Sequence, residues 1–188
     1  MGKSVNFGIR NLHYAVMTEG ETITYSTPVS IEGAVSVTMT PEGDTGPFYA
    51  DDRKFFVTVT NNGYTCELEV ANLPDSFFED VLGNTISAQD KVMTETADVQ
   101  PKNFALLFEE GGDGEKTMYA LYNCVATRPT RTMNTVNETT TPQTRTLTVT
   151  ASPSPDTRVT ARWTTSDTPE EVVEGWYQEV WTQDTTGA

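Results

Sequence analysis

The stretch that decides the fold class of this chain is FFVTVTNNGYTCELEV, residues 55–70. On both sides of Asn61-Asn62-Gly63, apolar and polar side chains alternate, and this period of two is typical of strands with one buried face. Asn and Gly tolerate the positive φ angles of tight hairpin turns. The stretch therefore predicts a β-hairpin with its turn at 61–63. In its second strand, Thr65, Glu67 and Glu69 occupy the solvent face.

The same periodicity recurs along the chain, with turn residues at short intervals. It predicts strands at 12–17, 22–25, 29–39, 104–108, 117–125, 145–151 and 158–163. Of these, 104–108 and 117–125 flank an acidic turn at 109–114 and predict a hairpin, and 145–151 with 158–163 predict another around 153–156. We interpret 84–103 as a flexible hairpin and the Thr-rich segment 130–140 as an exposed strand or a mobile segment. Many short strands predict an all-β sandwich or barrel, here a single domain over 1–188.

Two short helices are expected beside the strands. Pro74 suits a first helical turn and Gly83 a helix end, and the apolar residues between them are spaced to face a sheet. The second helix is predicted at about 169–181, where Thr168 and Glu171 form a capping box around Pro169. Its apolar face would consist of Val172, Val173, Trp176, Tyr177, Val180 and Trp181.

Residues 40–54, TPEGDTGPFYADDRK, read as a long extended loop. Two prolines and two glycines within it argue against a helix or a central strand. Loops of about 15 residues without regular structure are uncommon inside compact domains and are usually functional. Phe48 and Tyr49 have no use in a purely solvated loop. We therefore expect the loop either to close as a lid on its own domain or to reach a neighbouring molecule.

The formal net charge of -15 limits the kinds of molecule that the chain is expected to bind. It argues against tight binding to nucleic-acid phosphates, although it suits a wall past which DNA must slide. The N-terminus lacks the apolar stretch of a secretory signal, and no apolar run approaches a membrane span, so we expect the protein to be made and kept in a cytoplasm. Cys66 and Cys124 lie in apolar alternations and are predicted to be buried, unpaired thiols.

The sequence offers little catalytic chemistry, and we expect no enzyme, no cofactor and no metal site. His13 is the only imidazole and lies on a predicted strand, and no nucleophile elbow, phosphate-binding loop or dinucleotide fingerprint is present. Four acidic residues of the long loop, Glu42, Asp44, Asp51 and Asp52, lack the spacing of calcium loops. A glycosidase would need a carboxylate pair that the sequence does not single out. The tyrosines and phenylalanines of the strands fit core packing better than a carbohydrate-binding face.

Three ordered segments carry a family resemblance. They are IRNLHYAV at 9–16, FYADD at 48–52 before a hairpin, and ELEVANLP at 67–74, which runs into a helix ending VLG at 81–83. In order and spacing they resemble the major tail protein family of long, non-contractile-tailed phages, chiefly those of Gram-positive hosts. The resemblance covers most of the chain, including the Thr-rich region near its C-terminus, and is weakest at 84–100 and 130–141.

The resemblance implies a structural virion protein, the subunit of a tail tube. In this family a β-sandwich or barrel with a flanking helix assembles into hexameric rings, and the rings stack into a hollow tube through which DNA passes. The long loop reaches an adjacent subunit or ring, so the resemblance implies an interface at Phe48, Tyr49, Ala50, Asp51 and Asp52. The implied partners are further copies of the chain and the tape measure, tail terminator and tail-tip proteins. The implied location is the virion tail, after synthesis in the host cytoplasm.

The acidic charge then suggests that the lumen repels DNA, with Glu67 and Glu69 as candidate lumen residues. Two alternatives stay open at this point. One is a monomeric β-sandwich binding module that recognises glycans or decorates a surface. The other is a tube subunit of a bacterial injection system.

Overall fold

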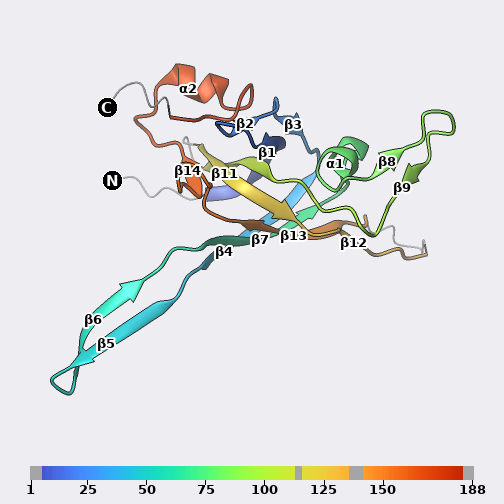
Figure 1. Cartoon of the computed structure of the whole chain (residues 1–188). Coiled ribbons are helices and arrows are strands. Elements are labelled where there is room, and N and C mark those ends of the chain that lie inside the picture. Colours follow the sequence, from blue (N-terminus) through green and yellow to red (C-terminus); the bar gives the residue numbers. More distant parts are fainter. Residues whose placement is uncertain (1–5, 113–115, 136–141, 184–188) are drawn as a thin grey trace.

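The computed structural model of the chain describes residues 6–112, 116–135 and 142–183. It is mainly β, with a large antiparallel sheet and two short helices, which confirms the predicted sandwich-like fold class (Figure 1). The elements follow in the order β1 (Asn6–Thr18), β2 (Thr24–Tyr25), β3 (Val29–Ser30), β4 (Ala34–Glu42), β5 (Thr45–Ala50), β6 (Arg53–Val59), β7 (Gly63–Val70), α1 (Asp75–Asp80), β8 (Thr85–Ile86), β9 (Met93–Thr94), β10 (Phe104–Gly112), β11 (Thr117–Ala126), β12 (Thr130–Arg131), β13 (Arg145–Ala151), β14 (Ala161–Trp163) and α2 (Glu170–Gly175).

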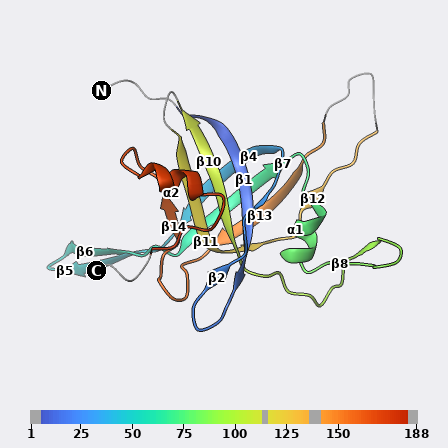
Figure 2. The ribbon, with the colours of Figure 1, turned by 90° about the horizontal axis from the view of Figure 1, so that it is seen from above.

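One ten-stranded sheet forms the body of the molecule. Its main path runs β2-β1-β10-β11-β13-β7-β4, while β3 pairs with β1, β12 with β13 and β14 with β11. The sheet curls until β4, at one end of this path, lies near β1, close to the other end (Figure 2). The curl encloses the main core and leaves an outer surface on which the remaining elements pack.

Helix α1 packs into the enclosed core with the residues that the sequence predicts to face a sheet. Phe77 and Phe78 are buried within the helix, and Val81 and Leu82 are buried directly after it. Gly83 ends this segment with a φ of +73°, and a Cβ at this position would lie 2.2 Å from Cγ1 of Val99. Glycine is therefore required here for both its backbone conformation and its lack of a side chain.

A second core lies on the outer face of β1, β10 and β11. Neighbouring side chains of a strand point to opposite faces, so in β10 Leu106 belongs to the enclosed core and Leu107 to the outer one. The segment that begins with α2 covers this outer face with Trp176 and Val180, and the Tyr122 hydroxyl donates a hydrogen bond to the Trp181 carbonyl. The C-terminal segment is thus held on the sheet by packing and by this bond.

The predicted C-terminal helix is present but shorter than expected. It ends at Gly175 rather than near 181, and Pro169, not Thr168, precedes its first helical residue. The predicted capping box is wrong, because the Thr168 hydroxyl accepts a hydrogen bond from the Thr165 amide at 2.8 Å instead of capping the helix. The apolar residues beyond the helix still reach the outer core from turns.

Strand pairing differs from the prediction in one of the hairpins. Strands β10 and β11 pair as expected across the acidic segment, of which 113–115 lies outside the described residues. In contrast, β13 and β14 do not pair with each other. Both strands pair with β11. Strand β14 pairs with residues 119–121 of β11, and β13 pairs with its residues 124–126. The long strand β11 offers one edge that the two shorter strands share.

Both segments that the sequence leaves ambiguous contain short strands among the described residues. Residues 84–103 contain the small hairpin of β8 and β9, as predicted, and the Arg128 Nε lies 3.1 Å from a Glu95 carboxylate oxygen in an ion pair that ties this arm to the body. The Thr-rich segment begins as the exposed strand β12, while its residues 136–140 lie outside the described ones.

Both thiols should be unreactive in the folded protein. Cys66 and Cys124 are fully buried and unpaired, as predicted, and burial raises the pKa of Cys66 to about 11 and also raises that of Cys124. At about pH 8 both thiols therefore stay protonated and inaccessible. We expect a thiol-specific reagent to modify neither in native buffer and both in denaturant. Rapid modification of either thiol in native buffer would contradict this.

Candidate functional site: a projecting hairpin and an uncovered sheet face

Residues 40–54 are extended, as predicted, but they are not an irregular loop. Strands β5 and β6 form a separate two-stranded sheet that projects far from the body (Figure 1). Asp51 and Asp52 form its two-residue turn, with φ angles of +53° and +56°. Two positive φ angles match the twist of a tight hairpin, and Asp tolerates them better than most residues. We call residues 45–59 the projecting hairpin.

The projecting hairpin replaces the hairpin that the sequence predicts at 55–70. Strand β6 does not pair with β7. It pairs with β5, and β7 pairs with β4, so the chain runs straight through Asn61 and Asn62. Gly63 has a φ of +113°, and a Cβ there would lie 2.0 Å from the Ala151 carbonyl oxygen. The glycine permits close packing of β7 on the chain after β13 and does not form a turn.

The junction between body and hairpin is hydrogen-bonded on both strands. The Thr60 amide donates to the Asp44 carbonyl at 3.0 Å, and the Asn62 amide to the Glu42 carbonyl at 2.8 Å. A Cβ on Gly43 would lie 2.1 Å from the Thr60 carbonyl oxygen, so the strands approach closely here. The hairpin therefore continues the β4–β7 pair outward, and the junction holds it away from its own domain.

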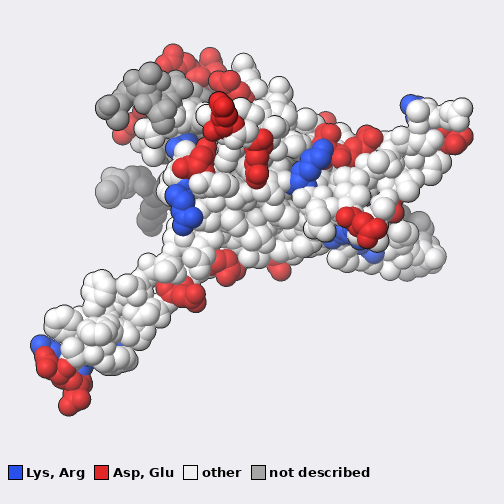
Figure 3. Space-filling model, in the orientation of Figure 1, with Lys and Arg blue, Asp and Glu red and all other residues white. Residues whose placement is uncertain are grey.

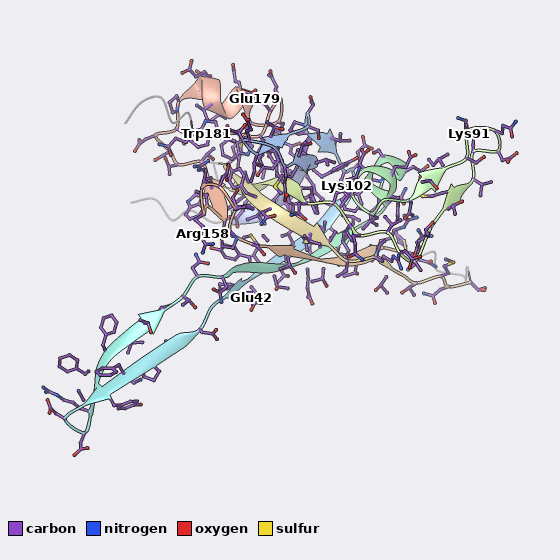
Figure 4. All side chains as sticks on the ribbon, in the orientation of Figure 1. Glu42, Lys91, Lys102, Arg158, Glu179 and Trp181 are labelled. Carbon is purple, nitrogen blue, oxygen red and sulfur yellow. The ribbon has the colours of Figure 1, made fainter. Side chains whose placement is uncertain are left out.

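The surface of the projecting hairpin is aromatic and exposed. Phe48, Tyr49, Phe55 and Phe56 each expose between 59% and 63% of their surface, and Figure 4 shows ring side chains standing off both sides of the ribbon. We call these four side chains the aromatic tip. Isolated two-stranded hairpins are only marginally stable in water, and contiguous exposed apolar surface marks an interaction site. The alternative of a lid on its own domain is thus excluded for this conformation.

Charge sets the hairpin apart from the rest of the chain. Its charged residues are Asp51, Asp52, Arg53 and Lys54, whose formal charges cancel, whereas the whole chain carries -15. Figure 3 shows these acidic and basic groups together at the far end of the projection. Copies of a strongly acidic protein repel one another, and a neutral projection is the part that can approach another copy at least cost.

All five residues predicted at the interface lie on the hairpin. Phe48 stands opposite Phe56, Tyr49 opposite Lys54 and Ala50 opposite Arg53, with Asp51 and Asp52 in the turn. The prediction missed Phe55 and Phe56, which it assigned to a buried face. The signal for them was available, because aromatic pairs flank Asp51-Asp52 on both sides.

The acidic residues of the predicted loop do not gather into a site. Glu42 and Asp44 lie at the base of the projection, where Figure 4 labels Glu42, while Asp51 and Asp52 lie at its far end. Among the described residues, no group of three or more His, Cys, Asp or Glu side chains is placed to hold a metal ion. His13 packs against Tyr177 with ring centroids 4.6 Å apart and ring planes tilted by 30°. In the described ranges, no helix is long and apolar enough to cross a membrane.

The outer face of β4, β7 and β13 is a polar surface that bears both candidate lumen residues. Cross-strand pairing places its side chains in three rows: Thr40, Thr65 and Thr150; Thr38, Glu67 and Thr148; Ser36, Glu69 and Thr146. We call these nine residues the threonine face. Glu67 is exposed, while Glu69 accepts hydrogen bonds from the hydroxyls of Thr144 at 2.6 Å and Ser36 at 3.4 Å. The face combines neutral hydroxyls with negative charge.

Strand β4 borders the threonine face as an edge strand. Within the described residues it pairs only with β7, so the backbone groups on its other side are not used by the sheet. Unpaired edges of this kind are templates for pairing with another chain.

No protein-family model and no curated protein sequence matches this chain.

Proposed function

We propose that this chain is a structural subunit that assembles into stacked hexameric rings, forming the hollow tail tube of a phage through which DNA passes. The observation that carries the proposal is the projecting hairpin: a charge-neutral projection, hydrogen-bonded at its junction, whose aromatic side chains are exposed and have no place in either core. Buried aromatic side chains dominate the energetics of protein interfaces, so such a projection supports contact with another molecule.

The shape of the molecule also allows repeated assembly. A projection that meets a different surface on the next copy makes a heterologous contact unless the two copies exchange their projections. Heterologous contacts propagate into rings or filaments, whereas self-complementary contacts stop at a dimer. The edge of β4 offers a second place at which neighbouring copies could join their sheets, and closure into a ring would remove that edge.

The threonine face supports the transport part of the proposal. A lumen must let DNA slide without sticking, and this face offers hydroxyls and two carboxylates, with no Lys or Arg among its nine residues. Acidic side chains line this side of the molecule below β4 and β7 in Figure 3. Negative charge repels phosphates, and hydroxyls make no strong ionic contact with them.

The direct test is electron microscopy of the purified protein at rising concentration, beside its mass from light scattering. Rings or hollow tubes whose mass grows with concentration are expected. The mass of a single chain at every concentration would contradict self-assembly and favour the monomeric binding module.

Reversing charge on the threonine face should impair DNA passage without impairing assembly. With Glu67→Lys and Glu69→Lys together, we expect particles to form but to deliver DNA at least about tenfold less often, because phosphates would bind a lysine-lined wall. Glu67→Lys alone keeps the hydrogen bonds of Glu69 and should show part of the effect. The matched control is Glu19→Lys with Glu21→Lys, the same charge change on exposed residues between β1 and β2. Normal delivery by the double variant would refute a lumen role for this face.

A further inference from the structure

All three tryptophans of the chain line one pocket on the body. Trp163 comes from β14, Trp176 directly follows α2, and Trp181 lies in the C-terminal segment. The pocket has a volume of about 470 Å³, and Arg162, Thr168 and Val172 complete much of its wall. We call it the tryptophan pocket. Figure 4 labels Trp181 beside α2, above the point at which the hairpin leaves the body.

The lining of the pocket is aromatic, and one of its polar groups has no hydrogen-bond partner in the described part of the chain. Trp163 leaves 55% of its surface exposed, and the Arg162 guanidinium lies 5.0 Å from the centre of the Trp181 ring. The Nε1 of Trp176 is buried and has no hydrogen-bond acceptor among the described residues. Buried polar groups are normally paired, so within the described ranges this indole N–H lacks the acceptor that such groups usually have.

We infer that the tryptophan pocket receives the aromatic tip of the projecting hairpin of a second copy of this chain. The two surfaces suit each other chemically: rings in the pocket would pack on rings of the tip, and backbone carbonyls at the hairpin turn offer acceptors. The inference rests on the proposed self-assembly and names the surface that the hairpin would bind.

Charge around the pocket matches the charge of the hairpin. Helix α2, along one side, carries Glu170, Glu171 and Glu174 and no basic residue, and Figure 3 shows this acidic cluster on top of the molecule. The hairpin offers Arg53 and Lys54 to that side, and Asp51 and Asp52 to Arg162 on the other. Such complementarity steers association and fixes its register.

The occupant must be another copy, because the geometry keeps the hairpin from its own pocket. The junction hydrogen bonds continue the hairpin outward from β4 and β7, so it runs down and away from β14 and α2, which contribute to the lining of the pocket (Figure 1). One chain therefore carries two different, mutually complementary surfaces that cannot meet within it. This arrangement permits open-ended assembly when the two surfaces of each copy bind two different neighbours.

Complementary variants of the full chain test the inference. The tip variant carries Phe48→Ser and Tyr49→Ser and keeps the pocket, whereas the pocket variant carries Trp163→Ser and keeps the tip. We expect the single pocket change to raise the protein concentration needed for assembly at least about thirtyfold and the double tip change to raise it about a thousandfold, while Trp163→Phe should raise it much less. Mixed in equal amounts, the two variants should form a complex with the mass of two chains, since one intact tip meets one intact pocket.

Tryptophan fluorescence locates the contact in the same mixture. All three tryptophans line the pocket, so the emission of the tip variant reports only on this site. The pocket variant keeps Trp176 and Trp181, so its own emission is measured separately and added to that of the tip variant. We expect the emission of the mixture to lie at shorter wavelength than this sum and to be less sensitive to acrylamide quenching.

Three outcomes would overturn the inference. Wild-type assembly by the pocket variant would remove the pocket from the interface while leaving self-assembly intact. Absence of any complex in the mixture, together with a monomeric wild type, would remove both proposals. An emission shift caused by oligosaccharides but not by the second variant would instead assign the pocket to a glycan-binding module.

Discussion

Phe48→Ser with Tyr49→Ser should leave the fold of the chain unchanged and abolish its assembly. Both side chains are exposed on the projecting hairpin and contribute nothing to either core. Surface substitutions of this kind usually change stability by about 0.5 kcal/mol or less. Aromatic anchors at the centre of an interface, in contrast, often cost about 2 kcal/mol or more each when truncated. Two of them together correspond to a loss in affinity of about a thousandfold.

The measurement pairs thermal unfolding with light-scattering mass and electron microscopy on the same samples. The unfolding midpoint should match that of the wild type, while rings and tubes should be missing at concentrations at which the wild type forms them. Val92→Ser is the matched control, because Val92 has a similar exposure of 58% but lies on the arm before β9. Tubes from the double variant at wild-type concentration would show that the hairpin is not the contact.

The projecting hairpin also shows which features of the structure could not be predicted from the sequence. The period of two in 55–59 correctly predicts a strand, but the same pattern wrongly places its aromatic side chains in the core. Alternating Phe and Val residues predict that a face of the strand will be buried. They do not indicate whether the same chain or another molecule buries it. For the same reason the Asn-Gly pair at 62–63 was a misleading turn signal: Gly63 serves a close approach to Ala151, and the turn lies at Asp51-Asp52.

Local patterns predicted the body more fully than they predicted its partners. The alternation in β7 placed Cys66, Leu68 and Val70 in the core and Glu67 on the outside, and the spacing around α1 gave its buried residues. Which strands pair was harder to predict, because β13 and β14 each fit a hairpin locally, while the long edge of β11 accepts both. The tryptophan pocket could not be predicted either, since it depends on how the end of the chain returns to β14.

Phe77 of helix α1 differs from the residues of the aromatic tip. The fold should depend on this side chain, whereas the interface should not. Phe77 is 1% exposed and packs edge-to-face on Tyr14 and Phe104, with ring centroids 5.2 and 5.8 Å away. The helix has only six residues and no side-chain cap, so packing rather than helix propensity holds it. The Tyr14 hydroxyl lies within hydrogen-bond distance of Ser76 and Asp80 on the same helix, at 2.9 and 3.0 Å. Loss of the Phe77 ring would loosen all these contacts together.

Phe77→Ala should therefore lower the free energy of unfolding by about 3–5 kcal/mol, a large part of the roughly 5–15 kcal/mol typical of a domain. Denaturant unfolding measures it, and Phe77→Leu, which keeps most of the volume, should cost under about 1.5 kcal/mol. Well below its lowered midpoint, the alanine variant should still assemble, because its hairpin and threonine face are intact. A cost under about 1 kcal/mol would contradict the central place of α1 in the core. Failure to assemble while folded would show that the enclosed core and the interface are coupled, against the separation that the projecting hairpin implies.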